Sequence, residues 1–442
     1  MKRFFKKDGP MNFVLPVIGE YAFTTAVSLV YSSVTGAISA SALAASATVN
    51  QAISFINALF SLVMTGSAIL TANLVGRREE AGASRTVEQS LLMAPVLSVS
   101  LSVVLFLLCR PVCRLLMPGA DELFLSEGMT FYRISMVSVP ALIISNTETG
   151  ILRAAGSSRP CLISTVAGNL VQVAALWLFT TKMKMGIAGV GRAAVACRVT
   201  SMFVATVAIL RSHRGFRVEW KRVLKPDFQA IRRILRLGAF TSVDAAGVQL
   251  GYVIINSLLV SLGTVEAGVH SELNAIITFT GICQSIASVT VTTLVGQRIG
   301  MGDIPGARRT TARIFLYTQI ATLLLCLPTM LFPTFTAGLF TKDAAILRGS
   351  ADFMWIMFPY CFLAVGVNVY EPAVKAAGET KFTMILVTAC IWCLRLPLTL
   401  LFCLKWHWGV PGVFAANMTS HTVRLLSDYF RVRGRKWGTK II

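Results

Sequence analysis

The fold is decided by an uncharged stretch, Tyr21–Gly76, which reads YAFTTAVSLVYSSVTGAISASALAASATVNQAISFINALFSLVMTGSAILTANLVG. These 56 residues contain no Asp, Glu, Lys or Arg. A membrane-spanning helix needs about 20 apolar residues, so the stretch is long enough for two consecutive spans. A soluble fold has no need of so long an uncharged run. The stretch therefore predicts an all-α, polytopic membrane protein.

The composition of all 442 residues extends this prediction. Apolar residues make up 55% of the chain and charged residues 14%, whereas a soluble domain usually carries about 25% charged residues. The 41 basic and 20 acidic residues give a net charge of +21, which in a soluble protein would suggest a nucleic-acid partner. Soluble enzymes, secreted proteins and nucleic-acid-binding domains are nevertheless disfavoured by the hydropathy of the chain.

Apolar segments bounded by charged or turn residues predict twelve transmembrane helices. The first segment is about twice as long as the apolar region of a cleaved signal peptide, so we expect it to be a membrane helix. The segments are residues 11–34, 48–75, 89–109, 128–150, 160–181, 187–210, 236–261, 268–297, 310–331, 350–372, 382–402 and 408–427.

The basic residues predict the orientation of these helices. If the N-terminus is cytoplasmic, 30 Lys and Arg residues fall on the cytoplasmic side and 7 in the outer loops. Because Lys and Arg are enriched in cytoplasmic loops, both termini are predicted to be cytoplasmic. The positive charge then sets the topology and attracts anionic lipid head groups, and no nucleic-acid partner is expected. We expect a monomer in the bacterial inner membrane.

Three short motifs recur at a nearly constant offset and predict an internal repeat. LVGR at 74–77 recurs as LVGQR at 294–298, RAAGSSR at 153–159 as KAAGETK at 375–381, and GIAGV at 186–190 as GVPGV at 409–413. Each half then holds six helices inserted the same way up, related by a two-fold axis along the membrane normal, with a binding site between the halves.

The repeat predicts three parts of the chain: an N-terminal bundle at 1–210, a basic linker at 211–235, and a C-terminal bundle with a basic tail at 236–442. Two interpretations of the linker stay open at this point. It is either an amphipathic helix on the membrane surface or a disordered basic loop.

Acidic residues inside the apolar segments are the first candidates for function, because a charge there costs about 2.5–3.5 kcal/mol on insertion scales. Glu20 and Asp244 lie at similar depths in the first and seventh helices, and their separation along the chain nearly equals the repeat offset. We expect them to be repeat-related mates on the two walls of the binding site, where they could bind a proton or a cation and attract a cationic substrate. In the alternative, each carboxylate only accepts hydrogen bonds from neighbouring side chains.

Two further acids are weaker candidates. Glu371 precedes Lys375 by four residues, the spacing of an ordinary helical ion pair. Glu272 lies near the outer end of its helix and is a candidate for an outer gate. The lone C-x-x-C motif at 390–393 has no second pair nearby, so neither a metal site nor another cofactor is expected. The sequence also lacks recognisable nucleotide-binding and enzymatic motifs, and we expect a transporter driven by an ion gradient rather than an enzyme.

Several features together match one family of transporters. They are the six-plus-six layout, the loop at 74–82 and its partner at 294–303, Gly189-x-Gly191-Arg192 at the start of helix 6, and Asn169 in helix 5. With these features the chain resembles the multidrug and toxic compound extrusion (MATE) family over essentially its whole length. The resemblance implies two bundles around a central cleft, and export of small organic, often cationic, compounds driven by inward Na⁺ or H⁺.

The acids that often couple ions in this family are largely missing here. Tyr31 stands where many members have an Asp late in helix 1, and Leu176 where many have an Asp in helix 5. Gln249 falls near the position of a Glu often found in helix 7. Tyr31, Asn169 and Gln249 are therefore the family-matched candidates for binding substrate or ion.

These observations predict a secondary antiporter that exports organic, cationic compounds in exchange for Na⁺ or H⁺. A flippase for a lipid-linked saccharide is the main alternative, and it would favour a cationic cleft. A non-transporting membrane scaffold would fit the missing acids.

Overall fold

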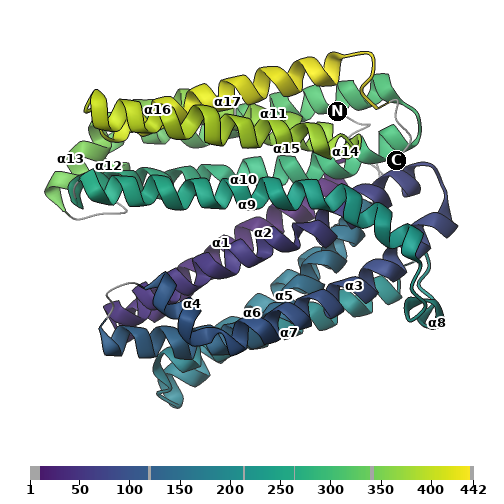
Figure 1. The fold of residues 1–442 in the computed structure, drawn as a ribbon, viewed down its shortest axis with the longest axis horizontal. Helices are drawn as coiled ribbons and strands as arrows, with labels where there is room; N and C mark the ends of the chain where they lie inside the picture. The colour runs from purple at the N-terminus through teal and green to yellow at the C-terminus, as the bar shows by residue number, and fades with distance from the viewer. Residues whose placement is uncertain (1–9, 118–120, 213–214, 263, 339–342, 439–442) are drawn as a thin grey trace. The chain divides into compact units, whose positions relative to one another are not determined.

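The structure is a computed structural model that describes residues 10–117, 121–212, 215–262, 264–338 and 343–438. Within these ranges the regular structure is helical, with no β-strand (Figure 1). The long helices are α1 (Pro10–Ile38), α2 (Ala40–Gly76), α3 (Glu80–Leu107), α5 (Glu122–Ala154), α6 (Arg159–Leu176), α7 (Gly186–Leu210), α9 (Phe228–Leu262), α10 (Thr264–Gly300), α11 (Ile304–Leu331), α14 (Met357–Ala376) and α17 (Val410–Arg433). The shorter helices are α4 (Cys109–Leu116), α8 (Trp220–Val223), α12 (Pro333–Gly338), α13 (Ala344–Phe353), α15 (Thr380–Ala389) and α16 (Leu396–Leu400).

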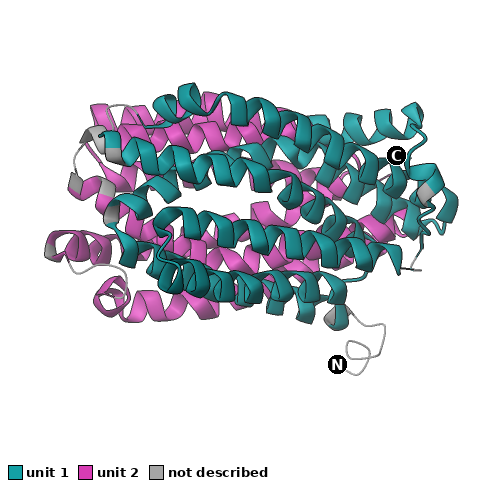
Figure 2. Cartoon of the chain, turned by 90° about the horizontal axis from the view of Figure 1, so that it is seen from below, with its two compact units in different colours: residues 1–239 teal, residues 240–442 magenta. Residues whose placement is uncertain are grey.

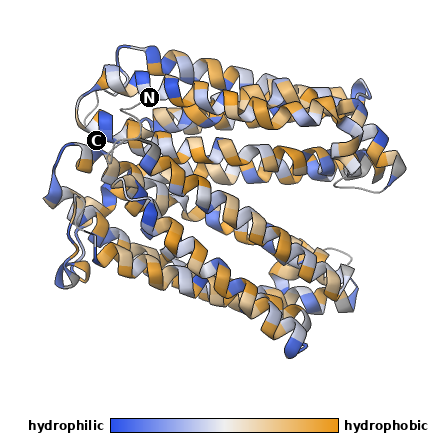
Figure 3. Cartoon of the chain, turned by 180° about the vertical axis from the view of Figure 1, so that it is seen from behind, coloured by the Kyte–Doolittle hydropathy of each residue, from blue (hydrophilic) through white to orange (hydrophobic). Residues whose placement is uncertain are grey.

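Eleven spans in the described part of the chain are long and apolar enough to cross a membrane. Ten of them contain the long helices other than α17, and the eleventh, Thr380–Lys405, runs through α15 and α16. The remaining long helix, α17, has 24 residues and is about 36 Å long at 1.5 Å per residue, which exceeds the hydrocarbon core of a bilayer. Its lower hydropathy reflects His421, Arg424 and Asp428 within its sequence. Figure 3 shows hydrophobic residues along most of each long helix. The prediction of an all-α protein with twelve spans is confirmed, and α17 is the most polar of them.

Most helices extend beyond the predicted apolar segments, because the prediction stopped at the first charged or turn residue. α2 begins at Ala40 rather than at residue 48, and the Ser39 hydroxyl oxygen caps it by accepting a hydrogen bond from the Ala42 amide at 2.9 Å. Three π-helical turns interrupt or end apolar spans: η1 (Trp177–Lys182), η3 (Cys390–Arg395) and η4 (Leu401–Lys405). The short helices α4 and α12 lie between spans and were not predicted.

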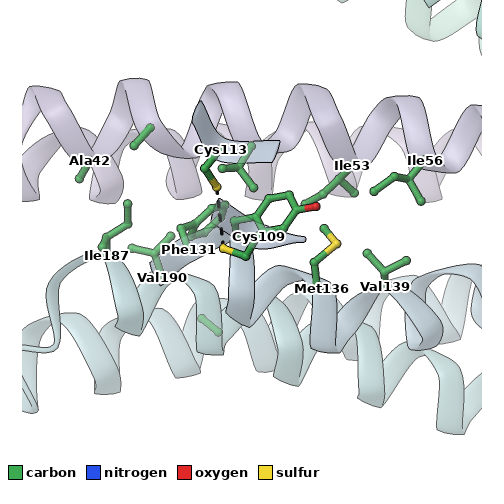
Figure 4. Packing of buried hydrophobic residues seen from close by; sticks show 14 of the residues in the cluster. Ala42, Ile53, Ile56, Cys109, Cys113, Phe131, Met136, Val139, Ile187 and Val190 are labelled. Atoms are coloured by element: carbon green, nitrogen blue, oxygen red, sulfur yellow. Dashed lines mark hydrogen bonds between the residues drawn. The ribbon is translucent and has the colours of Figure 1, made fainter. Parts of the chain in front are cut away.

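The chain forms two compact units, Met1–Ala239 and Phe240–Ile442, which are coloured separately in Figure 2. The boundary falls inside α9 rather than in a loop. In unit 1 the core packs around α5, where Phe131, Met136 and Val139 lie among Ile53 of α2 and Val190 of α7 (Figure 4). Small and β-branched side chains dominate the faces of α2 and α7, so the bulky residues of α5 fill the space between these helices.

Unit 2 has its own core of buried side chains from α10, α14 and α17. Leu273 and Ile276 of α10 belong to the same cluster as Met357 and Tyr360 of α14 and Phe414 of α17. The rings of Tyr360 and Phe414 meet edge to face, with centroids 5.6 Å apart. The two units therefore each hold a hydrophobic core built mainly from three long helices.

The described part of the predicted linker is anchored to α3. Three backbone amides of this segment donate hydrogen bonds to side chains of α3: Arg217 to Ser84 at 2.9 Å, Glu219 to Glu88 at 3.0 Å, and Asp227 to Gln89 at 3.0 Å. The Gln89 side chain also donates a hydrogen bond to the Lys225 carbonyl at 2.9 Å. α9 begins at Phe228, so residues 228–235 form its first turns. The described part of the segment is thus an ordered connection along α3, and its last residues are helical, as the first interpretation predicted for part of it. Its position on the membrane surface stays a prediction.

The start of α9 crosses α2 at two glycines. A Cβ atom on Gly238 would lie 1.6 Å from the Leu62 carbonyl oxygen, and one on Gly66 would lie 2.4 Å from the Ile234 carbonyl oxygen. Helix backbones approach this closely in membranes only where side chains are absent or very small. The crossing fixes the first part of α9 to unit 1.

Candidate functional site

In unit 1, Glu20 of α1 forms an ion pair with Arg153 of α5. Its Oε1 atom accepts hydrogen bonds from the Arg153 guanidinium and from the Thr165 hydroxyl of α6, the latter at 3.1 Å. Its Oε2 atom is buried without a hydrogen-bond partner. Glu20 is only 7% exposed, so one base and one hydroxyl replace most of its hydration. Pairing of this kind is how an ionised side chain is tolerated within a membrane span.

Asn169 of α6 extends this polar site one helical turn along α1. Its side-chain amide donates a hydrogen bond to the Thr24 hydroxyl at 3.4 Å, and Thr24 lies four residues after Glu20. The Cys197 thiol of α7 donates to Asn169 Oδ1 at 3.8 Å. Glu20 and Asn169 were predicted as separate candidates, and the structure joins them in one polar cluster.

In unit 2, Asp244 of α9 has a matching arrangement. The Lys375 ammonium of α14 donates a hydrogen bond to Asp244 Oδ2 at 2.6 Å and another to Glu371 Oε1 at 2.7 Å. Glu371 Oε2 accepts a hydrogen bond from the Arg424 guanidinium of α17. The four side chains form a charged network across three helices, with side-chain exposures between 4% and 18%. Two predicted candidates, Asp244 and Glu371, therefore share one ammonium group.

The same local turn positions the base in both units. α5 and α14 each end one residue after the base, and Gly156 and Gly378 follow with φ of 82° and 76°. The amides of these glycines donate to the carbonyls of Arg153 and Lys375 at 2.8 and 2.9 Å. Glycine is favoured at such a left-handed position, which ends a helix. The repeated sequences RAAG and KAAG thus encode a helix end that places a base beside the repeat-related acid.

The two ion pairs follow the internal repeat. Glu20 corresponds to Asp244 and Arg153 to Lys375, each at nearly the same offset as the repeated motifs. The sequence predicted the acids as mates but did not pair either acid with a base across helices. The sequence held a signal for this pairing, because the repeat aligns Arg153 with Lys375, as it aligns Glu20 with Asp244. The expected placement of the acids on two walls of one binding site concerns the two units together and stays a prediction.

Asp428 of α17 is a candidate that the sequence did not point to, because the last span was predicted to end at residue 427. It is 1% exposed, and both of its carboxylate oxygens are buried without a hydrogen-bond partner. It interacts electrostatically with all four members of the unit 2 network. Arg424 precedes it by four residues, so both lie on one face of α17. The four-residue spacing of Arg424 and Asp428 in an otherwise apolar segment was the sequence signal that could have identified Asp428.

The other predicted residues have different neighbours. Tyr31 packs against the hydrophobic cluster of unit 1. Glu272 Oε2 accepts a hydrogen bond from the Ser350 hydroxyl at 2.7 Å, and its Oε1 is buried without a partner. Gln249 lies partly buried on α9, five residues after Asp244. None of the three takes part in the ion-pair networks, and their roles stay predictions.

Both networks place carboxylates beside bases in apolar surroundings, an arrangement whose chemistry allows a carboxylate to hold a proton or a cation. No three His, Cys, Asp or Glu side chains of the described residues are grouped to hold a metal ion. The thiols of the C-x-x-C motif are free, with Cys390 buried and Cys393 exposed on η3.

Comparison with known proteins gives one consistent result. The MatE family model matches residues 16–178 and 242–401. The uncharacterized transporter YisQ of Bacillus subtilis is 24% identical over 403 residues, covering 88% of this chain and 86% of the relative. The probable multidrug resistance protein NorM of Thermotoga maritima is 22% identical over 448 residues, covering 98% and 93%.

Solved structures share the same fold. The outward-facing conformation of a multidrug resistance MATE family transporter of the MOP superfamily superposes with a TM-score of 0.90 at 18% identity, covering 98% of this chain and 96% of that one. The family match spans most of the chain and falls in both units. This multi-pass membrane protein belongs to the MatE family of transporters, as its sequence resemblance predicted.

Proposed function

We propose that this protein is a secondary active antiporter that exports organic, cationic compounds in exchange for Na⁺ or H⁺. The proposal includes a bacterial inner-membrane location, cytoplasmic termini, a monomeric state and no cofactor. Multidrug export is supported by the description of the Thermotoga maritima relative as a probable multidrug resistance protein. Gradient-driven transport is supported by the lack of a recognisable nucleotide-binding motif in the sequence.

One observation carries the proposal: each unit buries an acid–base pair inside its apolar helices, at repeat-related positions. Apolar packing needs no such charges, and each is costly to insert. A second cation at a paired carboxylate competes with the base for the same negative charge. A cationic substrate and a coupling ion that both change this pairing would therefore oppose one another. Mutually exclusive binding of two ligands is the condition for exchange.

Each ion pair also links two helices. In unit 1, Glu20 of α1 is held by Arg153 of α5 and Thr165 of α6. Displacing Arg153 removes a direct link between α1 and α5. A ligand that binds one arrangement better than another shifts the equilibrium by that difference in affinity. The ion pair is thus a means by which ligand binding changes helix packing.

Dye transport in reconstituted vesicles tests this function. Ethidium flux is measured with a pH gradient or a Na⁺ gradient imposed separately, at a clamped membrane potential. We expect one gradient to drive accumulation, and the Glu20→Gln/Asp244→Asn double variant to lose it. Asp352→Asn removes an exposed acid of α13 and serves as the matched control. Unchanged gradient-driven flux in the double variant would refute the role of the acids. No flux under either gradient would favour the flippase or scaffold alternatives.

A further inference from the structure

Asp428 is a buried acid that the proposed exchange at Glu20 and Asp244 does not use. It is 1% exposed, and neither carboxylate oxygen has a hydrogen-bond partner. It lies five residues before the end of α17 at Arg433, or about 7.5 Å along the helix. An ionised carboxylate that is buried and unpartnered is costly, whereas the protonated acid carries no charge. The site therefore favours the form of Asp428 that holds a proton.

The charges around Asp428 lead to the same conclusion. Three carboxyl groups, Asp244, Glu371 and Asp428, face only two bases, Lys375 and Arg424, and both bases are engaged with the first two acids. With every group ionised the cluster carries one negative charge, and one proton makes it neutral. The further titratable or charged groups near Asp428 are Cys390 of η3 and, one turn along α17, Arg431 with its partner Glu379.

The internal repeat indicates that packing does not require this acid. The offset between GIAGV and GVPGV aligns Asp428 with Ala205 of α7. Ala205 is fully buried, so unit 1 fills the matching place with a methyl group. The same sequence alignment of the repeats matches Arg424 of unit 2 with Ser201 of unit 1. The extra acid and base are specific to unit 2, which points to a role beyond stabilising the bundle.

We propose that Asp428 binds and releases the proton that drives transport, so that H⁺ is the coupling ion. The inference rests on the proposed antiport function and assigns its ion and one ion-binding residue. A metal cation needs several oxygen ligands and would be repelled by the adjacent ammonium and guanidinium groups. A proton needs only one carboxylate oxygen. On release, the O–H bond of Asp428 breaks and the proton passes to water at the near end of α17.

Arg424 can transmit this change to the rest of the network. Its guanidinium bonds to Glu371, while its Nε is buried without a hydrogen-bond partner. Asp428 lies four residues further along the same helix, within reach of the same guanidinium. Loss of the proton from Asp428 draws Arg424 away from Glu371, which then relies on Lys375 alone. Because Lys375 is also the partner of Asp244, proton release on α17 weakens the link between α14 and α9.

Infrared difference spectroscopy in lipid films tests proton binding without any substrate. Protonated carboxylic acids give a carbonyl stretching band that ionised acids lack. We expect the wild-type band of a buried acid to persist at neutral pH and vanish at alkaline pH. Glu148 and Glu272 are also buried acids with an unpartnered oxygen, so each variant spectrum is subtracted from the wild-type spectrum. The Asp428→Asn difference should contain this band, and the Asp352→Asn difference should not. Asp428→Ala, which copies the residue of unit 1, provides a second test if Asp428→Asn folds poorly. A difference spectrum that lacks the band for a folded Asp428 variant would overturn the proposal.

Ethidium transport then tests coupling. We expect a pH gradient, and not a Na⁺ gradient, to drive accumulation by the wild type. Asp428→Asn should lose this accumulation, and Asp428→Glu should recover part of it. Accumulation driven by Na⁺, or retained in Asp428→Asn, would overturn the inference while leaving the antiport function in place. If the wild type fails under both gradients, antiport and coupling both fail, and the infrared band alone decides whether Asp428 binds a proton.

Discussion

The ion pair of unit 1 makes a sharp prediction for Arg153→Met. The change removes the guanidinium and keeps an unbranched apolar side chain of similar length. Glu20 would then retain only the Thr165 hydroxyl as a partner, while its Oε2 is already unpartnered. Because Glu20 is 7% exposed, water cannot readily take the place of the base. The variant therefore leaves a carboxylate charge in an apolar site.

The expected size of the effect follows from that geometry. Removing one partner of a buried ion pair typically costs about 3–5 kcal/mol, because the other charge is left uncompensated. Removing both charges in Glu20→Gln/Arg153→Met should cost less than the sum of the single changes, by about 1–3 kcal/mol.

The free energy of unfolding is measured by titration with SDS in mixed micelles for the wild type, both single variants and the double variant. Arg298→Met is the control, since its pair with Asp303 spans 3.2 Å with side chains 40% and 47% exposed. An exposed pair of this kind contributes about 0–1 kcal/mol. Strictly additive losses for Glu20→Gln and Arg153→Met would refute the reasoning, because they would mean that the two charges do not stabilise one another.

Three other predictions concern the fold and its orientation. Gly238→Ala should prevent stable folding, because the new methyl would lie 1.6 Å from the Leu62 carbonyl oxygen. Gly281→Ala is the control and should be neutral or slightly stabilising, because no atom lies within 4 Å of the new methyl. Protein yield and thermal unfolding in detergent distinguish the two variants. Gln89→Ala should expose the connection before α9 to trypsin, because Gln89 holds the Lys225 carbonyl and the Asp227 amide; an unchanged cleavage rate would show that this anchor is dispensable. A reporter active only outside the cytoplasm should be silent when fused to either terminus, and activity at one terminus alone would contradict an even number of spans.

Much of the fold could be predicted because its causes are local in the chain. An apolar run as long as residues 21–76 can satisfy its backbone polar groups in a bilayer only as helix. The number of spans follows from counting such runs, and the repeat follows from motifs such as RAAG and KAAG. Errors arose where local signals compete. α9 begins well before its apolar segment, because Ile231 and Leu235 pack against α2 and α3 despite the basic residues between them.

The candidate site was predicted only in part, because charge pairing depends on how helices pack. Glu20 and Asp244 were found from their cost in a membrane, but their bases lie 133 and 131 residues away in the sequence. Arg153 and Lys375 lie in predicted cytoplasmic loops, where they count as charges that set the orientation, and the structure places them in largely buried ion pairs instead. A count of basic residues along the chain cannot separate these two uses.

The sequence by itself determined that this chain is a twelve-helix membrane protein of two related halves, and which acids its apolar helices carry. Only the tertiary structure decided that Glu20 and Asp244 are each neutralised by a base at the end of another helix, and that Asp428 is left without a hydrogen-bonded partner. The reason is physical. Hydropathy acts on each segment through its contact with lipid, whereas the state of a buried charge depends on the few atoms that packing brings within hydrogen-bonding distance.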